Sequence, residues 1–186
     1  MRILAVSGSL RSGSHNTRLL RVAAQQLPPG VELELYDGLK QIPPFDEDDE
    51  ASAAPEVAQW RTAIEAADAV LFATPEYNSS IPGQLKNAID WASRPKAQAA
   101  LRNTPVAVIG ASTSMFGGLW AQAELRKVLS ASGARVLDAE LAVATAHEAF
   151  DDDALADPEL ADALREVVAE LVDLAEQRSE TTRLAA

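Results

Sequence analysis

Short apolar runs separated by polar segments recur along the chain. Three of them are almost uniformly apolar, at residues 3–6, 69–74 and 106–110, and each is bounded by polar residues, glycine or proline. Runs of this kind are typical of strands that are buried on both faces of a parallel sheet. Residues 31–36 alternate apolar and acidic positions, which predicts a strand nearer an edge. A weaker fifth strand is predicted around residues 135–143.

Helical patterns lie between and after the apolar runs. They are predicted at residues 16–27, 55–66, 81–92, 117–132 and 158–177. The last one begins with Asp157-Pro158-Glu159, which provides an N-cap, a proline at the first helical position and an acid in the first turn. Because strand and helix patterns alternate about five times, the fold class predicted is α/β, an open parallel sheet with helices on both faces.

The length and composition predict a single domain. With 186 residues, 47% of them hydrophobic, the chain is long enough for one well-filled core and short for two. We expect the domain to span residues 1–178, followed by a flexible C-terminal tail at 179–186. Residues 37–54 combine a Pro-Pro pair with a run of acids and predict a long solvated loop. The acidic run lacks the spacing and the glycine of a calcium loop, so it does not predict a metal site.

The net charge, the length of the apolar runs and the cysteine and histidine content argue against several classes of function. A formal net charge of −12 argues against binding to the backbone of DNA or RNA. No apolar run approaches the roughly 18 residues that a membrane span needs, and we expect a cytoplasmic protein. The chain has no cysteine, and its two histidines, His15 and His147, are far apart, so thiol chemistry and a multi-histidine metal site are not predicted. Redox activity would therefore require a bound organic cofactor.

The segment after the first predicted strand has the character of an anion site. Residues 7–17 read SGSLRSGSHNT. In an open parallel sheet, this loop and the start of the next helix direct backbone N–H groups and a partial positive charge to one place. Arg11 adds a full charge in a fork that matches phosphate oxygens. The loop has neither GxxxxGK[ST] nor GxGxxG, which favours a terminal monophosphate. A simple N-capping loop is the alternative, since Ser14 and Asn16 are good N-caps.

A second polar loop follows the strand at 69–74. Pro75 ends that strand, and residues 76–79, Glu-Tyr-Asn-Ser, precede the helix predicted at 81–92. This loop lies at the same edge of the sheet as the first loop. A flat heterocycle with hydrogen-bonding edges would find an aromatic surface and polar groups there.

Three motifs resemble those of the NADPH-dependent FMN reductases of flavodoxin-like fold, a family that includes quinone, azo-dye and chromate reductases. They are GSLRSGSHN at 8–16, PEYNSSIPGQLKNAIDW at 75–91 and GASTSMFGGLWAQAELRKVL at 110–129. The resemblance covers essentially residues 2–175. It implies a three-layer sandwich around a five-stranded parallel sheet of order 2-1-3-4-5, with FMN and NADPH or NADH as cofactors.

The resemblance also assigns roles to residues. The first motif would hold the FMN phosphate through Ser9, Arg11, Ser14 and Asn16. The second would place Pro75, Glu76, Tyr77 and Asn78 beside the isoalloxazine ring. The third would bring Ser112 and Gly117 to the pyrimidine side. Since the flavin carries the chemistry, no catalytic side chain is predicted; for Glu76, hydrogen bonds to backbone are favoured over acid/base catalysis.

One motif departs from the family pattern. Many relatives have glycine close behind the serine of the third motif and arginine at the position of Trp120, whereas this chain reads Ser112-Thr113-Ser114-Met115-Phe116. This departure predicts a narrower, more apolar substrate pocket.

The function implied by the resemblance is transfer of hydride or electrons from NAD(P)H through FMN to a small acceptor. A quinone, a free flavin, an azo compound and a metal oxyanion all stay open, and so does the choice between NADPH and NADH. The family also implies a homodimer or homotetramer. Two alternatives share the fold: a flavodoxin-type electron carrier, and a flavin-free domain such as a phosphorelay receiver, although no aspartate acceptor follows the strand at 3–6 or 69–74.

Overall fold

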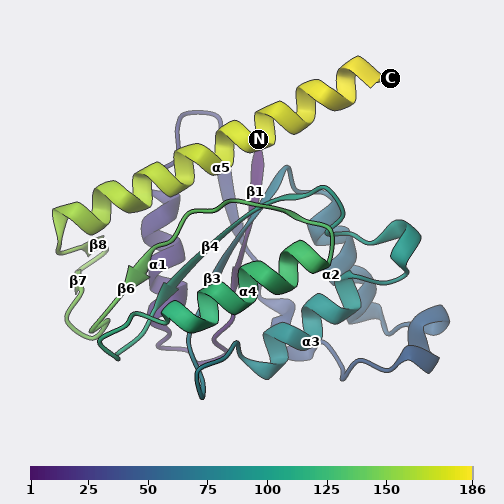
Figure 1. The fold of residues 1–186 in the computed structure, drawn as a ribbon, viewed down its shortest axis with the longest axis horizontal. Coiled ribbons are helices and arrows are strands. Elements are labelled where there is room, and N and C mark those ends of the chain that lie inside the picture. Colours follow the sequence, from purple (N-terminus) through teal and green to yellow (C-terminus); the bar gives the residue numbers. More distant parts are fainter. Residues whose placement is uncertain (186) are drawn as a thin grey trace.

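Six strands of the computed structural model, which describes residues 1–185, form one central parallel sheet. They are β1 (Arg2–Ser7), β2 (Glu32–Leu35), β3 (Ala69–Thr74), β4 (Pro105–Ala111), β5 (Arg135–Val136) and β6 (Ala142–Val143). The main path is β2-β1-β3-β4-β5, which confirms the predicted order and the flavodoxin-like fold. Its central strands β1, β3 and β4 are labelled in Figure 1. β3 and β4 are buried along their whole length, as their uniformly apolar sequences predict.

The predicted fifth strand is split in two. β5 and β6 both pair with β4, Leu137 and Leu141 also bond to its backbone, and residues 138–140 between them leave the ladder. Arg126 of the preceding helix reaches this segment, where its guanidinium donates to the carbonyl of Ala139 and to the carboxylate of Glu140. The two acids of this segment, Asp138 and Glu140, are therefore exposed to solvent, and Glu140 is paired with Arg126. The apolar strand is interrupted at these residues.

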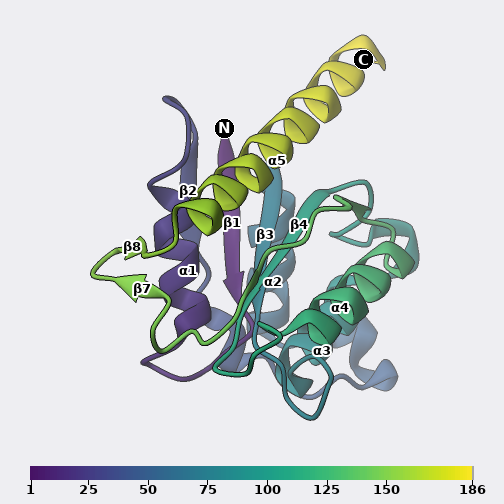
Figure 2. The ribbon, with the colours of Figure 1, turned by 60° about the vertical axis from the view of Figure 1, so that its left-hand side comes forward.

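Helices cover both faces of the sheet. They are α1 (His15–Ala24), α2 (Pro55–Glu65), α3 (Gly83–Ala92), α4 (Leu119–Ala131) and α5 (Pro158–Ala185). α1 and α5 lie on one face, and α2, α3 and α4 on the other (Figures 1 and 2). Alternate residues of β1 serve the two cores, Leu4 and Val6 on the side of α2 to α4, and Ile3 and Ala5 on the side of α1 and α5.

The segment at 37–54 differs from the predicted solvated loop. It contains two short 3₁₀ helices, η1 (Gly38–Gln41) and η2 (Glu47–Ser52). Leu39 and Ile42 are buried in the core, and the carbonyl of Pro43 accepts hydrogen bonds from the indole N–H of Trp91 and the amide of Asn87. The acidic residues 46–49 are all exposed, as are Lys40 and Gln41. The apolar residues among the polar ones anchor this segment to α3.

The remaining elements are peripheral to the sheet. A 3₁₀ helix, η3 (Lys96–Gln98), follows α3, and a short hairpin of β7 (Phe150–Asp151) and β8 (Ala154–Leu155) precedes α5. α5 continues to Ala185, so residues 179–185 extend a helix that was predicted to end at 177, and residue 186 lies outside the described residues. Among residues 1–185, no helix has the length and apolar character needed to cross a bilayer.

We predict that Asn87→Ala loosens the segment at 37–54. Asn87 donates to the carbonyl of Pro43 at 2.8 Å and accepts from the N–H of Phe45 at 2.6 Å. The substitution leaves a part-buried N–H unpaired, so urea denaturation should show a loss of about 1–3 kcal/mol in unfolding free energy. Lys86→Ala is the matched control on the same helix, because its exposed ion pair with Asp90 contributes only about 0.5 kcal/mol. Equal losses in the two variants would contradict this role.

Candidate functional site

A cavity of about 370 Å³ opens where β1, β3 and β4 end, at the edge at which ligands bind in open parallel sheets. Eight of the ten predicted site residues line it: Ser9, Arg11, Ser14, Asn16, Pro75, Glu76, Tyr77 and Ser112. His15, Ala111 and Thr113 complete the lining, and Asn78 and Gly117 are not part of it. The structure thus brings together three loops that lie far apart along the chain, at residues 9–16, 75–77 and 111–113. The volume of the cavity is within the usual range for ligand pockets.

The first loop presents free donors to the cavity. Ser14 caps α1, since its hydroxyl oxygen accepts from the N–H of Thr17 at 3.1 Å. The N–H groups of His15 and Asn16, in the first turn, have no acceptor within the helix. Gly8 allows the loop to lie close to its neighbour, because a Cβ there would be 3.3 Å from Pro75. The geometry suits an anion at the start of α1.

Arg11 supplies the positive charge of this loop. Its side chain is exposed and makes no ion pair or hydrogen bond with any residue in the range 1–185. Burial lowers the pKa of the neighbouring His15, and the charges of Arg11 and Arg18 lower that pKa further. His15 is therefore neutral near pH 7, and the uncompensated cation at the cavity is the Arg11 guanidinium.

Asn16 has a structural role that the sequence did not reveal. Its side chain is 2% exposed, and it donates from Nδ2 to the carbonyl of Ala111 and accepts at Oδ1 from the N–H of Ala111, both at 2.9 Å. Both side-chain polar atoms thus bind the backbone of Ala111, and the predicted contact of Asn16 with phosphate stays a prediction for its backbone N–H. Only the N–H of Asn16 is free for an anion.

The second loop is a tight hairpin. Tyr77 and Ser80 exchange two backbone hydrogen bonds, and Asn78 and Ser79 between them have positive φ angles of 52° and 61°. These angles are those of a type I′ turn, in which asparagine is favoured at the first central position. Asn78 is therefore a turn residue that does not line the cavity, and its predicted place beside the ring stays a prediction. Tyr77 lines the cavity and is 52% exposed.

Glu76 connects the second loop to the third. Its Oε2 accepts from the N–H of Ala121, in the first turn of α4, at 3.1 Å. Gly118, the N-cap residue of α4, has no side chain to serve this purpose. A carboxylate at this end of a helix is also favoured by the helix dipole. The hydrogen bond to backbone agrees with the role that the sequence favoured for Glu76.

The third loop, residues 112–118, is shaped by close contacts that sequence reasoning missed. The hydroxyl oxygen of Ser112 accepts from the N–H of Ser114 at 3.1 Å, which folds the loop back at the cavity. Gly117, outside the cavity, has a φ of 59°, and a Cβ there would be 2.6 Å from the carbonyl carbon of Ala142. Gly110 likewise makes room for Gln122, a fully buried side chain. Gly110 and Gly117 in the third motif were the sequence signal that could have indicated these close contacts.

Exposed apolar side chains follow this loop. Met115 is 75% exposed, and Phe116 and Trp120 are each 48% exposed. The rings of Phe116 and Trp120 meet edge to face, with centroids 4.8 Å apart. We call Met115, Phe116 and Trp120 the apolar rim. It is consistent with the apolar character that the sequence predicts for this side of the site.

A parallel sheet of this order, with an anion-binding loop after β1 and polar and aromatic loops after β3 and β4, defines a flavodoxin-like flavin-binding protein. The family model of the NADPH-dependent FMN reductases matches residues 1–148, and the chain belongs to this family.

Similar proteins agree with this assignment. The NAD(P)H-dependent FMN reductase of Pseudomonas aeruginosa is 46% identical over 153 residues, 81% of this chain and 82% of that one. A quinone reductase of Pseudomonas putida is 41% identical over 128 residues, 68% of each chain. The solved structure of FerB, a flavoenzyme NAD(P)H:(acceptor) oxidoreductase from Paracoccus denitrificans, matches with a TM-score of 0.83 and 34% identity, over 95% of this chain and 97% of that one.

These findings confirm the predicted class of function. The protein is an NAD(P)H-dependent flavin oxidoreductase with FMN as its cofactor, and it is an enzyme. The alternative of a flavodoxin-type electron carrier is not favoured. In this class the flavin carries the redox chemistry, and the protein supplies binding, orientation and electrostatics.

We predict that Gly117→Ala destabilises the protein and the third loop. The substitution would force alanine into a left-handed backbone conformation and place its Cβ against the backbone of Ala142. Urea denaturation should therefore show a loss of about 2–4 kcal/mol in unfolding free energy. Gly30→Ala is the matched control. Gly30 also has a positive φ, of 86°, but nothing lies within 4 Å of a Cβ there, so only the backbone strain of about 1–2 kcal/mol applies. A loss at Gly117 no larger than the loss at Gly30 would refute the close contact.

Proposed function

We propose that the cavity seats FMN with its phosphate at the first loop and its ring between the second and third loops, and that a quinone is the electron acceptor. The observation that carries the seating is the free Arg11 guanidinium, which lies in one cavity with the unbonded N–H groups of α1 and with Tyr77. A dianionic phosphate requires charge and several donors, and this loop offers both.

Each group has a part in holding the cofactor. Ser9, Arg11 and Ser14 and the N–H of Asn16 bind the phosphate in this proposal. Pro75, Glu76 and Tyr77 contact the ring, and Ser112 contacts its pyrimidine side. The N-terminus of α4 adds a partial positive charge beside Ser112, which stabilises negative charge on that part of the ring. No side chain is required as a nucleophile or base.

The phosphate assignment predicts a selective loss in Arg11→Ala. FMN binding should weaken by about 1.5–3 kcal/mol, the range for hydrogen bonds to charged groups. Riboflavin, which has no phosphate, should bind the variant and the original protein equally. Flavin fluorescence titration measures both affinities. Arg21→Ala, which removes the same charge from an exposed position of α1 outside this cavity, is the control. An equal loss for FMN and riboflavin would count against the assignment.

The apolar rim supports a quinone as the acceptor. Phe116 and Trp120 expose flat aromatic surface next to Glu76, whose Oε2 is bound to the turn of α4 that contains Trp120. Flat aromatic molecules pack favourably on such rings, whereas a metal oxyanion gains nothing from them. Several relatives are named quinone reductases, among them that of Pseudomonas putida.

We predict that Trp120→Ala impairs quinone reduction selectively. The KM for a benzoquinone should rise about two- to tenfold, the equivalent of losing one aromatic contact. Ferricyanide, which has no aromatic ring, should be reduced as before. Steady-state assays with NADPH measure both, and anaerobic bleaching of the flavin by NADPH shows that the first half of the cycle is intact.

The control for this test is Leu184→Ala, which removes an exposed apolar side chain from the end of α5. Sedimentation of each variant checks that its assembly is unchanged. A parallel loss with quinone and ferricyanide would contradict the role of the apolar rim in acceptor binding.

We also propose that the protein is a homodimer or homotetramer in the cytoplasm. Contiguous exposed apolar side chains are typical of interaction surfaces, and the apolar rim offers such a surface beside the cavity. A second subunit there would cover part of the rim and complete the wall of the site. A cytoplasmic location supplies the reduced nicotinamide, either NADPH or NADH, that the enzyme consumes.

A further inference from the structure

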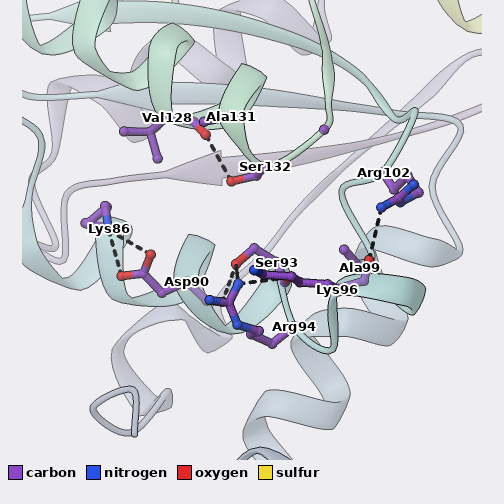
Figure 3. Close-up of a pocket in the computed structure, with 11 residues that line it drawn as sticks. Lys86, Asp90, Ser93, Arg94, Lys96, Ala99, Arg102, Val128, Ala131 and Ser132 are labelled. Carbon is purple, nitrogen blue, oxygen red and sulfur yellow. Dashed lines mark hydrogen bonds and ion pairs between the residues drawn. The ribbon is translucent and has the colours of Figure 1, made fainter. Parts of the chain in front are cut away.

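A second cavity, of about 420 Å³, lies at the opposite edge of the sheet. It is enclosed by the C-terminal ends of α3 and α4 and by residues 93–102, which precede β4 (Figure 3). It shares no lining residue with the flavin cavity. Four cations and one carboxylate line it, namely Lys86, Arg94, Lys96, Arg102 and Asp90. This concentration of positive charge is notable in a chain whose net charge is −12.

Two of the four cations are not neutralised. Lys86 is paired with Asp90 at 2.7 Å, and Arg94 lies 3.7 Å from the carboxylate of Glu50. The ammonium of Lys96 has no ion pair or hydrogen bond within the described range, and Arg102 uses one of its five donors, at 3.2 Å to the carbonyl of Lys96. Lys96 and Arg102 therefore leave an excess of two positive charges at this cavity.

Capping of the helices does not account for these two cations. Cations are favoured at helix C-termini, and both α3 and α4 end here. The last turns are closed by backbone, however, because the N–H of Ser93 donates to Ile89 and that of Ser132 donates to Val128. The guanidinium of Arg102 donates to the carbonyl of Lys96 in η3 and to neither helix. The cations thus stay available to a ligand.

The opposite wall is of a different character. Val128 and Ala131 of α4 and the hydroxyl of Ser132 lie across the cavity from Lys86, Asp90 and Arg94 (Figure 3). The hydroxyl of Ser132 donates to the carbonyl of Val128 at 2.9 Å and keeps its acceptor capacity. A cavity with one cationic wall and one mostly apolar wall fits a small organic anion, and its volume lies within the usual range for small ligands.

We propose that this cavity binds a small, multiply charged anion, a phosphate ester or a polycarboxylate, through Lys96 and Arg102. Two unpaired cations on one wall select for at least two negative charges, and the planar guanidinium of Arg102 matches the oxygens of either group. Binding here is independent of the flavin cavity, since the two share no residue. The acidic net charge opposes it at long range, an effect that moderate salt screens.

Calorimetric titration of the FMN-saturated protein tests the proposal, with pyrophosphate and citrate as probes in separate titrations. Saturation with FMN keeps the probes out of the first loop. We expect one saturable site per chain, and a loss of affinity for the bound probe of about tenfold or more in Lys96→Ala and in Arg102→Ala. Both positions are exposed, so both variants should fold, which thermal unfolding verifies. The probe that binds with the higher affinity shows whether the cavity prefers a phosphate or a carboxylate ligand.

Two control variants show whether the heat of binding measured by calorimetry comes from this cavity. Lys40→Ala removes an exposed charge elsewhere and should change the affinity by less than about twofold. Arg11→Ala, titrated at an FMN concentration raised until this weaker-binding variant is also saturated, alters only the flavin cavity and should leave the anion affinity unchanged. The absence of saturable binding, or binding that survives in both cavity variants, would overturn the proposal. A loss of binding in Arg11→Ala alone would place the anion at the first loop and would also overturn it.

Discussion

The pairing of Asn16 with Ala111 is the interaction on which the functional site depends. One buried side-chain amide satisfies both backbone polar groups of Ala111, the last residue of β4. A buried amide that lost these partners would leave four polar groups unsatisfied, which makes the connection costly to break. It holds the start of α1, with its unbonded N–H groups, against the start of the third loop. The first and third loops therefore keep a fixed spacing.

Two further contacts complete this arrangement. The N–H of Gly8 donates to the carbonyl of Ala73 at 2.8 Å, which joins the first loop to β3. Glu76 joins the second loop to α4. The side chains facing the cavity thus belong to loops that are fixed at their bases, whereas the apolar rim and Tyr77 stay exposed. This division suits an enzyme that must hold a cofactor firmly and exchange its substrates.

Local charge, and not total charge, decides where this acidic protein can bind anions. The chain has 16 Lys and Arg residues and 28 Asp and Glu residues, and Arg2, Arg126 and Arg165 are among the cations that are paired with a carboxylate. Arg11 in the flavin cavity and Lys96 in the second cavity lack such partners among the described residues. In both proposals a small anion meets such a cation at short range, where the interaction is screened less than the long-range repulsion from the net charge.

The sequence by itself determined the main strands, their order through the family resemblance, and most of the residues that line the cavity, because apolar periodicity and loop motifs are local properties. It predicted eight residues that the structure brings into one cavity. The tertiary structure decided what depends on distant partners. Asn16 bonds across 95 positions and Glu76 across 45, so neither partner is visible in a local pattern. The anchoring of residues 37–54 to α3 and the split of the last strand depend on such contacts as well, with side chains of α3 and with Arg126. The turn at Asn78 is the exception, since Asn-Ser between Tyr77 and Ser80 was a local signal that the resemblance obscured.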